Sequence, residues 1–122
     1  MGRVVHFELP ADDPERAVNF YQKALGWTIR KWDGPVEYWL VMTGPEDEPG
    51  IDGGLAPRSE LQVGAVNTVD VASVAETVAR VEEHGGKVVH PRHPVPGVGW
   101  MAYCEDTEGT VFGVMERDPD AE

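Results

Sequence analysis

Near its start the chain carries RVVHFEL at residues 3–9, followed at once by DDPE at residues 12–15. In the first segment Val5, Phe7 and Leu9 alternate with other residues, which is typical of a strand whose two faces have different uses. In the second segment an aspartate cap precedes a proline, a pattern typical of the first turn of a helix. The opening of the chain therefore predicts a strand that leads directly into a helix.

The same order returns about sixty residues later, which indicates a duplicated unit. AVNTV at residues 65–69 leads into a second helix signal, SVAE at residues 73–76. Further along, IDGGL at residues 51–55 falls opposite VFGVM at residues 111–115. A unit this small cannot bury its own sheet, so we expect the two copies to face each other.

Between these landmarks, apolar runs and turn residues complete a βαβββ order in each copy. The remaining strands are predicted at residues 27–32, 38–43 and 51–55 in the first copy, and at 87–90, 99–105 and 110–116 in the second. We expect an exposed acidic loop at 44–50, a linker at 56–62, a proline-broken connection at 91–97 and a frayed tail at 118–122. The prediction is one α+β domain over residues 1–122, with modules at 1–56 and 63–117.

Composition restricts the classes of partner. A formal net charge of −12 disfavours nucleic acid and anionic membrane surfaces, because both would repel the chain. The apolar runs are too short to span a bilayer, and no signal peptide is evident at the start. The single Cys104 allows neither a disulfide framework nor a cysteine metal cluster. The expected location is the cytoplasm.

Several segments together resemble the vicinal oxygen chelate superfamily, which includes glyoxalase I, extradiol dioxygenases and bleomycin-resistance proteins. They are VHFELPADDPERA at 5–17, FY at 20–21, LGW at 25–27 and DTEGTVFG at 106–113, and the glyoxalase-like branch is the most similar. The resemblance implies a cleft enclosed by two curved mixed sheets with the helices outside. It also implies a homodimer, which the tryptophan-rich strands favour as well.

The resemblance bears on metal binding. In the metal-using members, four positions on the first and last strands of the two modules carry His, Gln or Glu ligands. Carried over to this chain, the four positions are His6, Val66, Gly53 and Gly113, of which His6 alone can bind a metal ion. Because catalytic metal sites generally take three protein ligands, we predict no family metal and no other cofactor.

A metal site built from other donors stays open. Glu8 shares the strand face of His6, and His90 or His93 could complete a site for nickel, zinc, iron or manganese. The chain would then be a metal-dependent lyase, isomerase or dioxygenase acting on a substrate with vicinal oxygens. A third reading is a metal-free enzyme with His6 as the base and Glu8 as the group that orients it.

The preferred interpretation is a pocket for an organic molecule. Gly53 and Gly113 either permit close backbone approach or leave a floor for a flat ligand. Aromatic rings that could stack on such a ligand are found on the neighbouring strands. We therefore predict binding of a small hydrophobic or aromatic molecule in the cleft between the modules, and leave open whether the protein is an enzyme. The predicted ligand-binding residues are His6, Glu8, Tyr38, Trp39, Gly53, Val66, Trp100, Tyr103 and Gly113.

Overall fold

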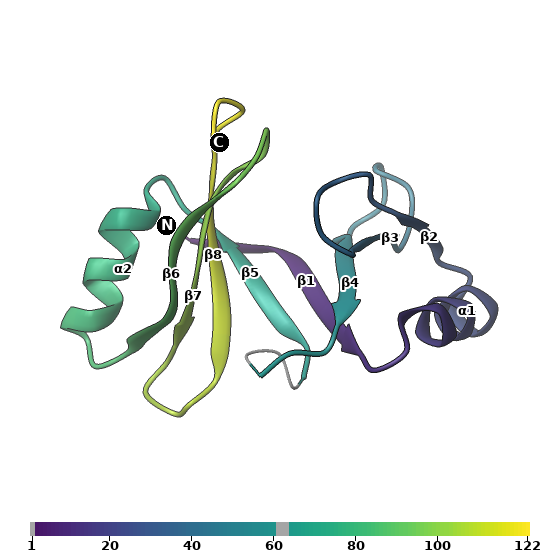
Figure 1. The fold of residues 1–122 in the computed structure, drawn as a ribbon, viewed down its shortest axis with the longest axis horizontal. Coiled ribbons are helices and arrows are strands. Elements are labelled where there is room, and N and C mark those ends of the chain that lie inside the picture. The colour runs from purple at the N-terminus through teal and green to yellow at the C-terminus, as the bar shows by residue number, and fades with distance from the viewer. Residues whose placement is uncertain (1, 61–63) are drawn as a thin grey trace. The chain divides into compact units, whose positions relative to one another are not determined.

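A computed structural model describes residues 2–60 and 64–122, and the chain divides into two compact units (Figure 1). The first module below is His6–Val66, and the second module is Met1–Val5 together with Asn67–Glu122. Both follow the predicted βαβββ order, and the α+β class is confirmed. Neither helix of the described residues has the length and apolar character that crossing a membrane requires.

The first module is a mixed sheet with one helix. Its elements are β1 (Arg3–Ala11), α1 (Pro14–Leu25), β2 (Thr28–Lys31), β3 (Trp39–Met42) and β4 (Gly53–Pro57). The strand order is β2-β3-β4-β1, with β1 parallel to β4 and the other pairs antiparallel. Asp13, one of the two aspartates of the predicted cap, accepts a hydrogen bond from the Arg16 backbone N–H, and Gly26 ends α1 in the left-handed region at φ 73°.

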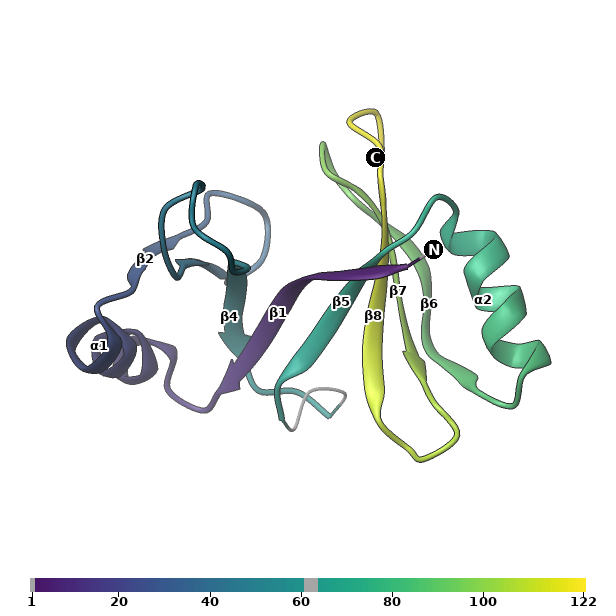
Figure 2. The ribbon, with the colours of Figure 1, turned by 180° about the vertical axis from the view of Figure 1, so that it is seen from behind.

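The second module repeats this arrangement. Its elements are β5 (Val66–Asp70), α2 (Val74–Glu83), β6 (Lys87–Val95), β7 (Gly99–Glu105) and β8 (Val111–Arg117). The strand order is β5-β8-β7-β6, with β5 parallel to β8. In both views α2 lies along one side of the β6–β8 strands (Figure 1 and Figure 2). Ser73 caps α2 by accepting from the Glu76 backbone N–H.

Each module has a core on the side of its sheet that the helix covers. In the first module this core contains Trp39, Val41 and Leu55, with Phe7 and Leu9 packed against it. In the second module the core consists of Val74, Ala102 and Val114, and its packed neighbours are Val69, Val71, Val78, Trp100 and Phe112. Because side chains alternate along a strand, the residues between these point to the other side of their own sheet. We call that side the helix-free face of each module.

Two sequence predictions about the second module are wrong. The strand predicted at 87–90 continues to Val95, with irregular register on either side of His90. The order β5-β8-β7-β6 leaves β6 at an edge, where a proline costs no ladder hydrogen bond on the open side. The tail at 118–122 does not fray, because Ala121 is buried and its carbonyl accepts from Gly97 N–H at 3.0 Å.

The linker predicted at 56–62 is described only in part. Ala56 and Pro57 belong to β4, which extends two residues beyond its predicted end. Residues 61–63, including the predicted start of the second module, lie outside the described residues. The strands predicted at 27–32 and 38–43 are present, each shortened by one residue at both ends.

Candidate functional site

The candidate site begins on β1, where His6 and Glu8 lie on the helix-free face of the first module. Their neighbours Phe7 and Leu9 pack into the core beneath α1, so alternation directs His6 and Glu8 to the opposite side. Glu8 is 8% exposed, and His6 is half-buried. A carboxylate buried to this degree is costly unless polar groups surround it.

Tyr38, the residue just before β3, joins these two side chains. Its hydroxyl group lies 2.9 Å from Nε2 of His6 and donates a hydrogen bond to Oε2 of Glu8 at 3.2 Å. The backbone carbonyl of Tyr38 accepts from Trp32 N–H at 2.8 Å, and the two rings meet edge to face. The structure therefore brings together three predicted site residues and fixes the order Glu8–Tyr38–His6, which the sequence did not indicate.

Gly54 makes room for this cluster. It lies opposite Glu8 in the β1–β4 register, and a Cβ atom at Gly54 would collide with the hydroxyl and ring of Tyr38. The predicted Gly53 faces the other way, because a Cβ there would meet the ring and carbonyl of Phe7 on the α1 side. The glycine that shapes the helix-free face is therefore Gly54, and the prediction of Gly53 is corrected by one residue.

In the second module, too, a glycine on the last strand faces the helix-free side of the sheet. Gly113 lies opposite Thr68 in the β5–β8 register, just as Gly54 lies opposite Glu8. A Cβ atom on Gly113 would approach Met101, Tyr103 and Thr68 at 3.2 to 3.5 Å, on the helix-free face. Thr68 is almost fully buried, and its hydroxyl has no hydrogen-bond partner among the residues that the structure describes. The sequence analysis missed both Gly54 and Thr68. The signals were the pairing of Glu8 with β4 for Gly54, and the sixty-residue repeat, which places Thr68 at the position of Glu8.

Burial keeps the His6 imidazole neutral near pH 7. Burial lowers the pKa of His6 below its usual 6.5, and the nearby carboxylates of Glu8 and Asp52 oppose this shift without cancelling it. Asp52 comes immediately before β4, and its Oδ1 atom also accepts a hydrogen bond from Thr43 N–H at 2.9 Å. The site therefore combines an uncharged imidazole with carboxylates on the same module.

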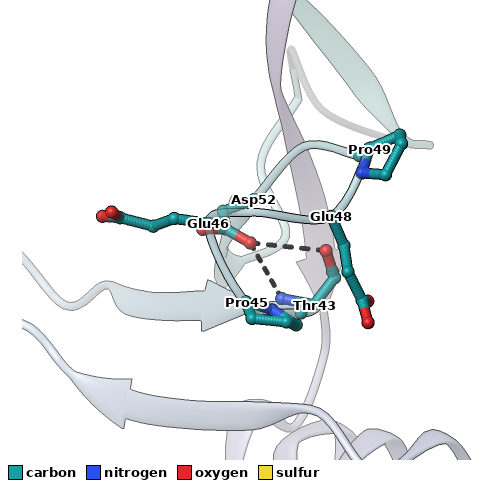
Figure 3. Close-up of a pocket in the computed structure, with 8 residues that line it drawn as sticks. Thr43, Pro45, Glu46, Glu48, Pro49 and Asp52 are labelled. Carbon is teal, nitrogen blue, oxygen red and sulfur yellow. Dashed lines mark hydrogen bonds between the residues drawn. The ribbon is translucent and has the colours of Figure 1, made fainter.

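The acidic loop predicted at 44–50 forms a small polar hollow of its own (Figure 3). The Thr43 hydroxyl donates to the Ile51 carbonyl at 2.7 Å, and Asp52 closes the loop from its other end. In Figure 3 the carboxylate groups of Glu46 and Glu48 extend away from the hydrogen-bonded Thr43–Asp52 pair. These contacts explain the shape of the loop without a bound molecule.

Two of the predicted aromatic residues pack on the helix-covered side of their own sheets. Trp39 is buried in the core beneath α1, with the ammonium group of Lys31 5.5 Å from its ring centre. Trp100 packs on the α2 side of the second module, where its Nε1 donates to Asp118 and Arg92 stacks on its ring at 3.8 Å. Both tryptophans therefore serve packing within their own modules.

A separate ring cluster lies where β6 pairs with β7. The ring centres of His90 and His93 are 4.4 Å apart, and the Tyr103 ring lies 6.2 and 6.4 Å from them. Burial, and then the neighbouring His93, lower the pKa of His90. Val66, the remaining predicted residue, is buried in β5 and offers no polar atom in its side chain.

The residues present do not fit the metal of the metal-using members. With the strand register of the structure, the four ligand positions are His6, Gly54, Val66 and Gly113. Three of them have no donor atom in their side chains. Glu116, the nearest glutamate in sequence to Gly113, accepts from Val74 N–H at the start of α2. In the described ranges, no three His, Cys, Asp or Glu side chains are grouped closely enough to hold an ion.

Comparison with known proteins gives a consistent family. The family model described as Glyoxalase/Bleomycin resistance protein/Dioxygenase superfamily matches residues 3–114. A probable chloroplastic lactoylglutathione lyase of Arabidopsis thaliana is 31% identical over 98% of this chain, which spans only 37% of that protein's length. A glyoxylase-like domain-containing protein of Didymella fabae is 27% identical, over 95% of this chain and 94% of its own length.

A solved structure shows the same fold. The methylmalonyl-CoA epimerase of Mycobacterium tuberculosis superimposes with a TM-score of 0.69 at 15% identity, and the match covers 95% of this chain and 88% of the epimerase. At this level of identity the likeness concerns the fold alone.

Proposed function

Since the chain belongs to the Glyoxalase/Bleomycin resistance protein/Dioxygenase superfamily, we propose that it binds a small hydrophobic or aromatic molecule without the metal ion of the metal-using members. The binding surface is the helix-free face that carries His6. The single observation behind this proposal is the chain of hydrogen bonds from Glu8 through Tyr38 to His6. These bonds join a carboxylate, a hydroxyl group and an imidazole into one polar group on this face, beside Gly54.

Such a combination suits an organic ligand. Binding sites for small molecules are mainly apolar and carry a few polar groups that fix orientation. Here Gly54 keeps the surface beside Glu8 free of a Cβ atom, and Trp32 meets Tyr38 edge to face at 6.0 Å between ring centres. His6 supplies the polar contact, while the Tyr38 ring supplies an apolar one.

The donor set supports the metal-free part of the proposal. Glycine and valine side chains at Gly54, Gly113 and Val66 cannot coordinate an ion, and His6 with Glu8 gives fewer ligands than catalytic metal sites generally use. Glu8 is also engaged with Tyr38, so its oxygen atoms are shared with the hydrogen-bond chain. We therefore derive no chemical step through a metal.

A second candidate function is a metal-free lyase or isomerase. It is favoured by the state of His6, which is neutral and hydrogen-bonded through Nε2. In this state Nδ1 can accept a proton, as a general base must. The relative in Arabidopsis carries the name of a lyase, and the comparison structure is that of an epimerase. In this reading Tyr38 and Glu8 orient the base and stabilise its protonated form.

The binding function is tested by a compound screen followed by thermal unfolding. A set of small aromatic and apolar compounds is expected to contain members that raise the Tm of the wild-type protein, because a ligand that binds the folded state stabilises it. The same compounds should lose their effect on His6→Ala. Stabilisation that is unchanged in His6→Ala would place the ligand elsewhere and contradict the proposal.

The enzyme reading needs its own assay. Lactoylglutathione, the compound in the name of the Arabidopsis relative, is offered to the protein with and without a chelator. Turnover that survives chelation and disappears in His6→Ala would favour the metal-free enzyme. Turnover that chelation abolishes would support the metal-dependent alternative instead.

The proposal also includes a homodimer in the cytoplasm. Phe20 and Leu25 on α1 are more than half exposed, and a partner chain would cover apolar side chains of this kind. Cys104 is a free thiol, as expected in a reducing compartment. A strictly monomeric mass at micromolar concentration would contradict the dimer.

A further inference from the structure

The hydrogen-bond directions at the site determine which nitrogen atom of His6 carries the proton. As a carboxylate, Glu8 can only accept, and Tyr38 has a single hydroxyl proton, which it donates to Oε2 of Glu8. The hydroxyl oxygen therefore presents a lone pair to His6 Nε2, 2.9 Å away. A hydrogen bond across this distance requires that Nε2 be the donor.

A neutral imidazole carries one N–H, so the other ring nitrogen is an acceptor. With the proton on Nε2, the acceptor is Nδ1. The bond to Tyr38 is the one hydrogen bond that His6 makes among the residues the structure describes, so Nδ1 has no partner there. Within the described part of the chain, the site thus holds a half-buried acceptor whose lone pair has no partner.

We infer that Tyr38 is a positioning residue which fixes His6 as a hydrogen-bond acceptor through Nδ1, and that the ligand is therefore a neutral hydrogen-bond donor such as a phenol, an enol or a heteroaromatic N–H compound. This inference rests on the proposed function and names the ligand class of the same site. It assigns to Tyr38 a role beyond stacking, because the tyrosine selects the tautomer that recognises the ligand.

The charges around His6 also favour a neutral ligand over an anionic one. Glu8 and Asp52 both lie close enough to act on the imidazole, and the whole chain carries a formal net charge of −12. A carboxylate or phosphate ligand would meet a lone pair on Nδ1 as well as these negative charges, so it would be repelled. A neutral molecule with an O–H or N–H group avoids both costs.

The tautomer is tested on the wild-type protein without any ligand. Two-bond proton–nitrogen correlation spectra of uniformly labelled protein at pH 7.5 distinguish a protonated ring nitrogen from an unprotonated one. We expect His6 to show a protonated Nε2 and an unprotonated Nδ1. A protonated Nδ1 would overturn the inference, whatever the protein binds.

The ligand class is tested with a matched pair of probes, 2-naphthol and its methyl ether 2-methoxynaphthalene, by calorimetry at pH 7.5. The two share an aromatic body, but only the naphthol can donate a hydrogen bond to Nδ1. We expect the naphthol to bind about tenfold more tightly, the usual effect of one hydrogen bond to a partly buried acceptor. Equal binding of both probes would overturn the ligand class and leave the proposed function standing.

Tyr38→Phe and Tyr21→Phe form a matched pair of variants. Each removes one hydroxyl, but Tyr21 lies on α1 with its ring stacked on Trp27, away from His6. In Tyr38→Phe we expect a mixture of His6 tautomers and a naphthol preference reduced to about twofold, whereas Tyr21→Phe should match the wild type. An unchanged tautomer and an unchanged preference in a folded Tyr38→Phe protein would refute the role of Tyr38.

The experiments distinguish a failure of the binding function from a failure of the positioning role of Tyr38. If His6 shows the expected tautomer but neither probe nor any screened compound binds, the binding function is wrong and the ligand class falls with it. The positioning role of Tyr38 would then still hold, because the nitrogen spectra measure it directly.

Discussion

The hydroxyl group of Tyr38 occupies the space where a Cβ atom at Gly54 would stand. The Tyr38 side chain therefore fills the helix-free face at Gly54, the residue that lies opposite Glu8 in the β1–β4 register. In this chain the space is used for a hydrogen-bond chain to Glu8 and His6.

Gly54→Ala should therefore disrupt the site. The added methyl group collides with Tyr38, and overpacking of this kind costs about 1–3 kcal/mol. We expect a lower free energy of unfolding by denaturant, together with loss of the His6–Tyr38 hydrogen bond. Gly64→Ala is the control, because no atom of the described residues lies within 4 Å of its added Cβ atom. A Gly54→Ala protein as stable as this control would contradict the contact.

Ligand binding should weaken in acid. The folded-state pKa of His6 lies below its unfolded value of about 6.5, so between the two values the unfolded chain binds more protons. The contribution of neutral His6 to stability is therefore complete above pH 6.5 and is lost as the pH falls through the folded pKa. We expect 2-naphthol affinity to follow the same curve, with a midpoint below 6.5. A His6→Gln variant should lack this transition, and a midpoint above 6.5 would be inconsistent with burial as the main cause.

The protein should not retain metal. After incubation with nickel, zinc, iron(II) or manganese and desalting, elemental mass analysis is expected to find far less than one ion per chain. The reason is that three of the four ligand positions have no donor atom in their side chains. His6→Ala serves as the reference for adventitious binding. Near-stoichiometric metal that this variant loses would sink the metal-free proposal.

Thr68→Val should leave the fold intact and stabilise it by about 1 kcal/mol. The Thr68 hydroxyl is buried without a partner among the described residues, and an unpaired buried hydroxyl costs about 1–3 kcal/mol. Valine has nearly the same shape and lacks the polar atom. Chemical denaturation measures the difference, and Thr77→Val is the control, because Thr77 donates to the Ser73 carbonyl at 2.8 Å and should lose stability. Equal effects at both positions would contradict the assignment.

Cys104 should be inert toward thiol reagents. Its side chain is fully buried, and burial, with Glu82 as a smaller cause, raises the pKa of the thiol. We expect modification by a disulfide reagent to be slow in buffer and rapid in denaturant. Fast reaction of the folded protein would show that this part of the second module opens readily.

Much of the fold was predictable because local signals agreed with each other. The aspartate cap of α1, the helix signal at residues 73–76 and the alternation along β1 were read correctly from neighbouring residues alone. The errors occurred where the decisive partner lies elsewhere in the chain. The prolines at Pro91 and Pro94 signal a break, but the edge position of β6 tolerates them.

The sequence by itself predicted the duplicated βαβββ order, indicated the family through its resemblance, and singled out His6 and Glu8 as candidates, because these signals can be read from the residues of each segment alone. Only the tertiary structure decided that Gly54 rather than Gly53 faces them, since one residue of register turns a side chain to the other side of a sheet. It alone also placed Tyr38, thirty residues from Glu8, between that carboxylate and the imidazole of His6. Hydrogen bonds between distant residues depend on strand pairing, which no local pattern records.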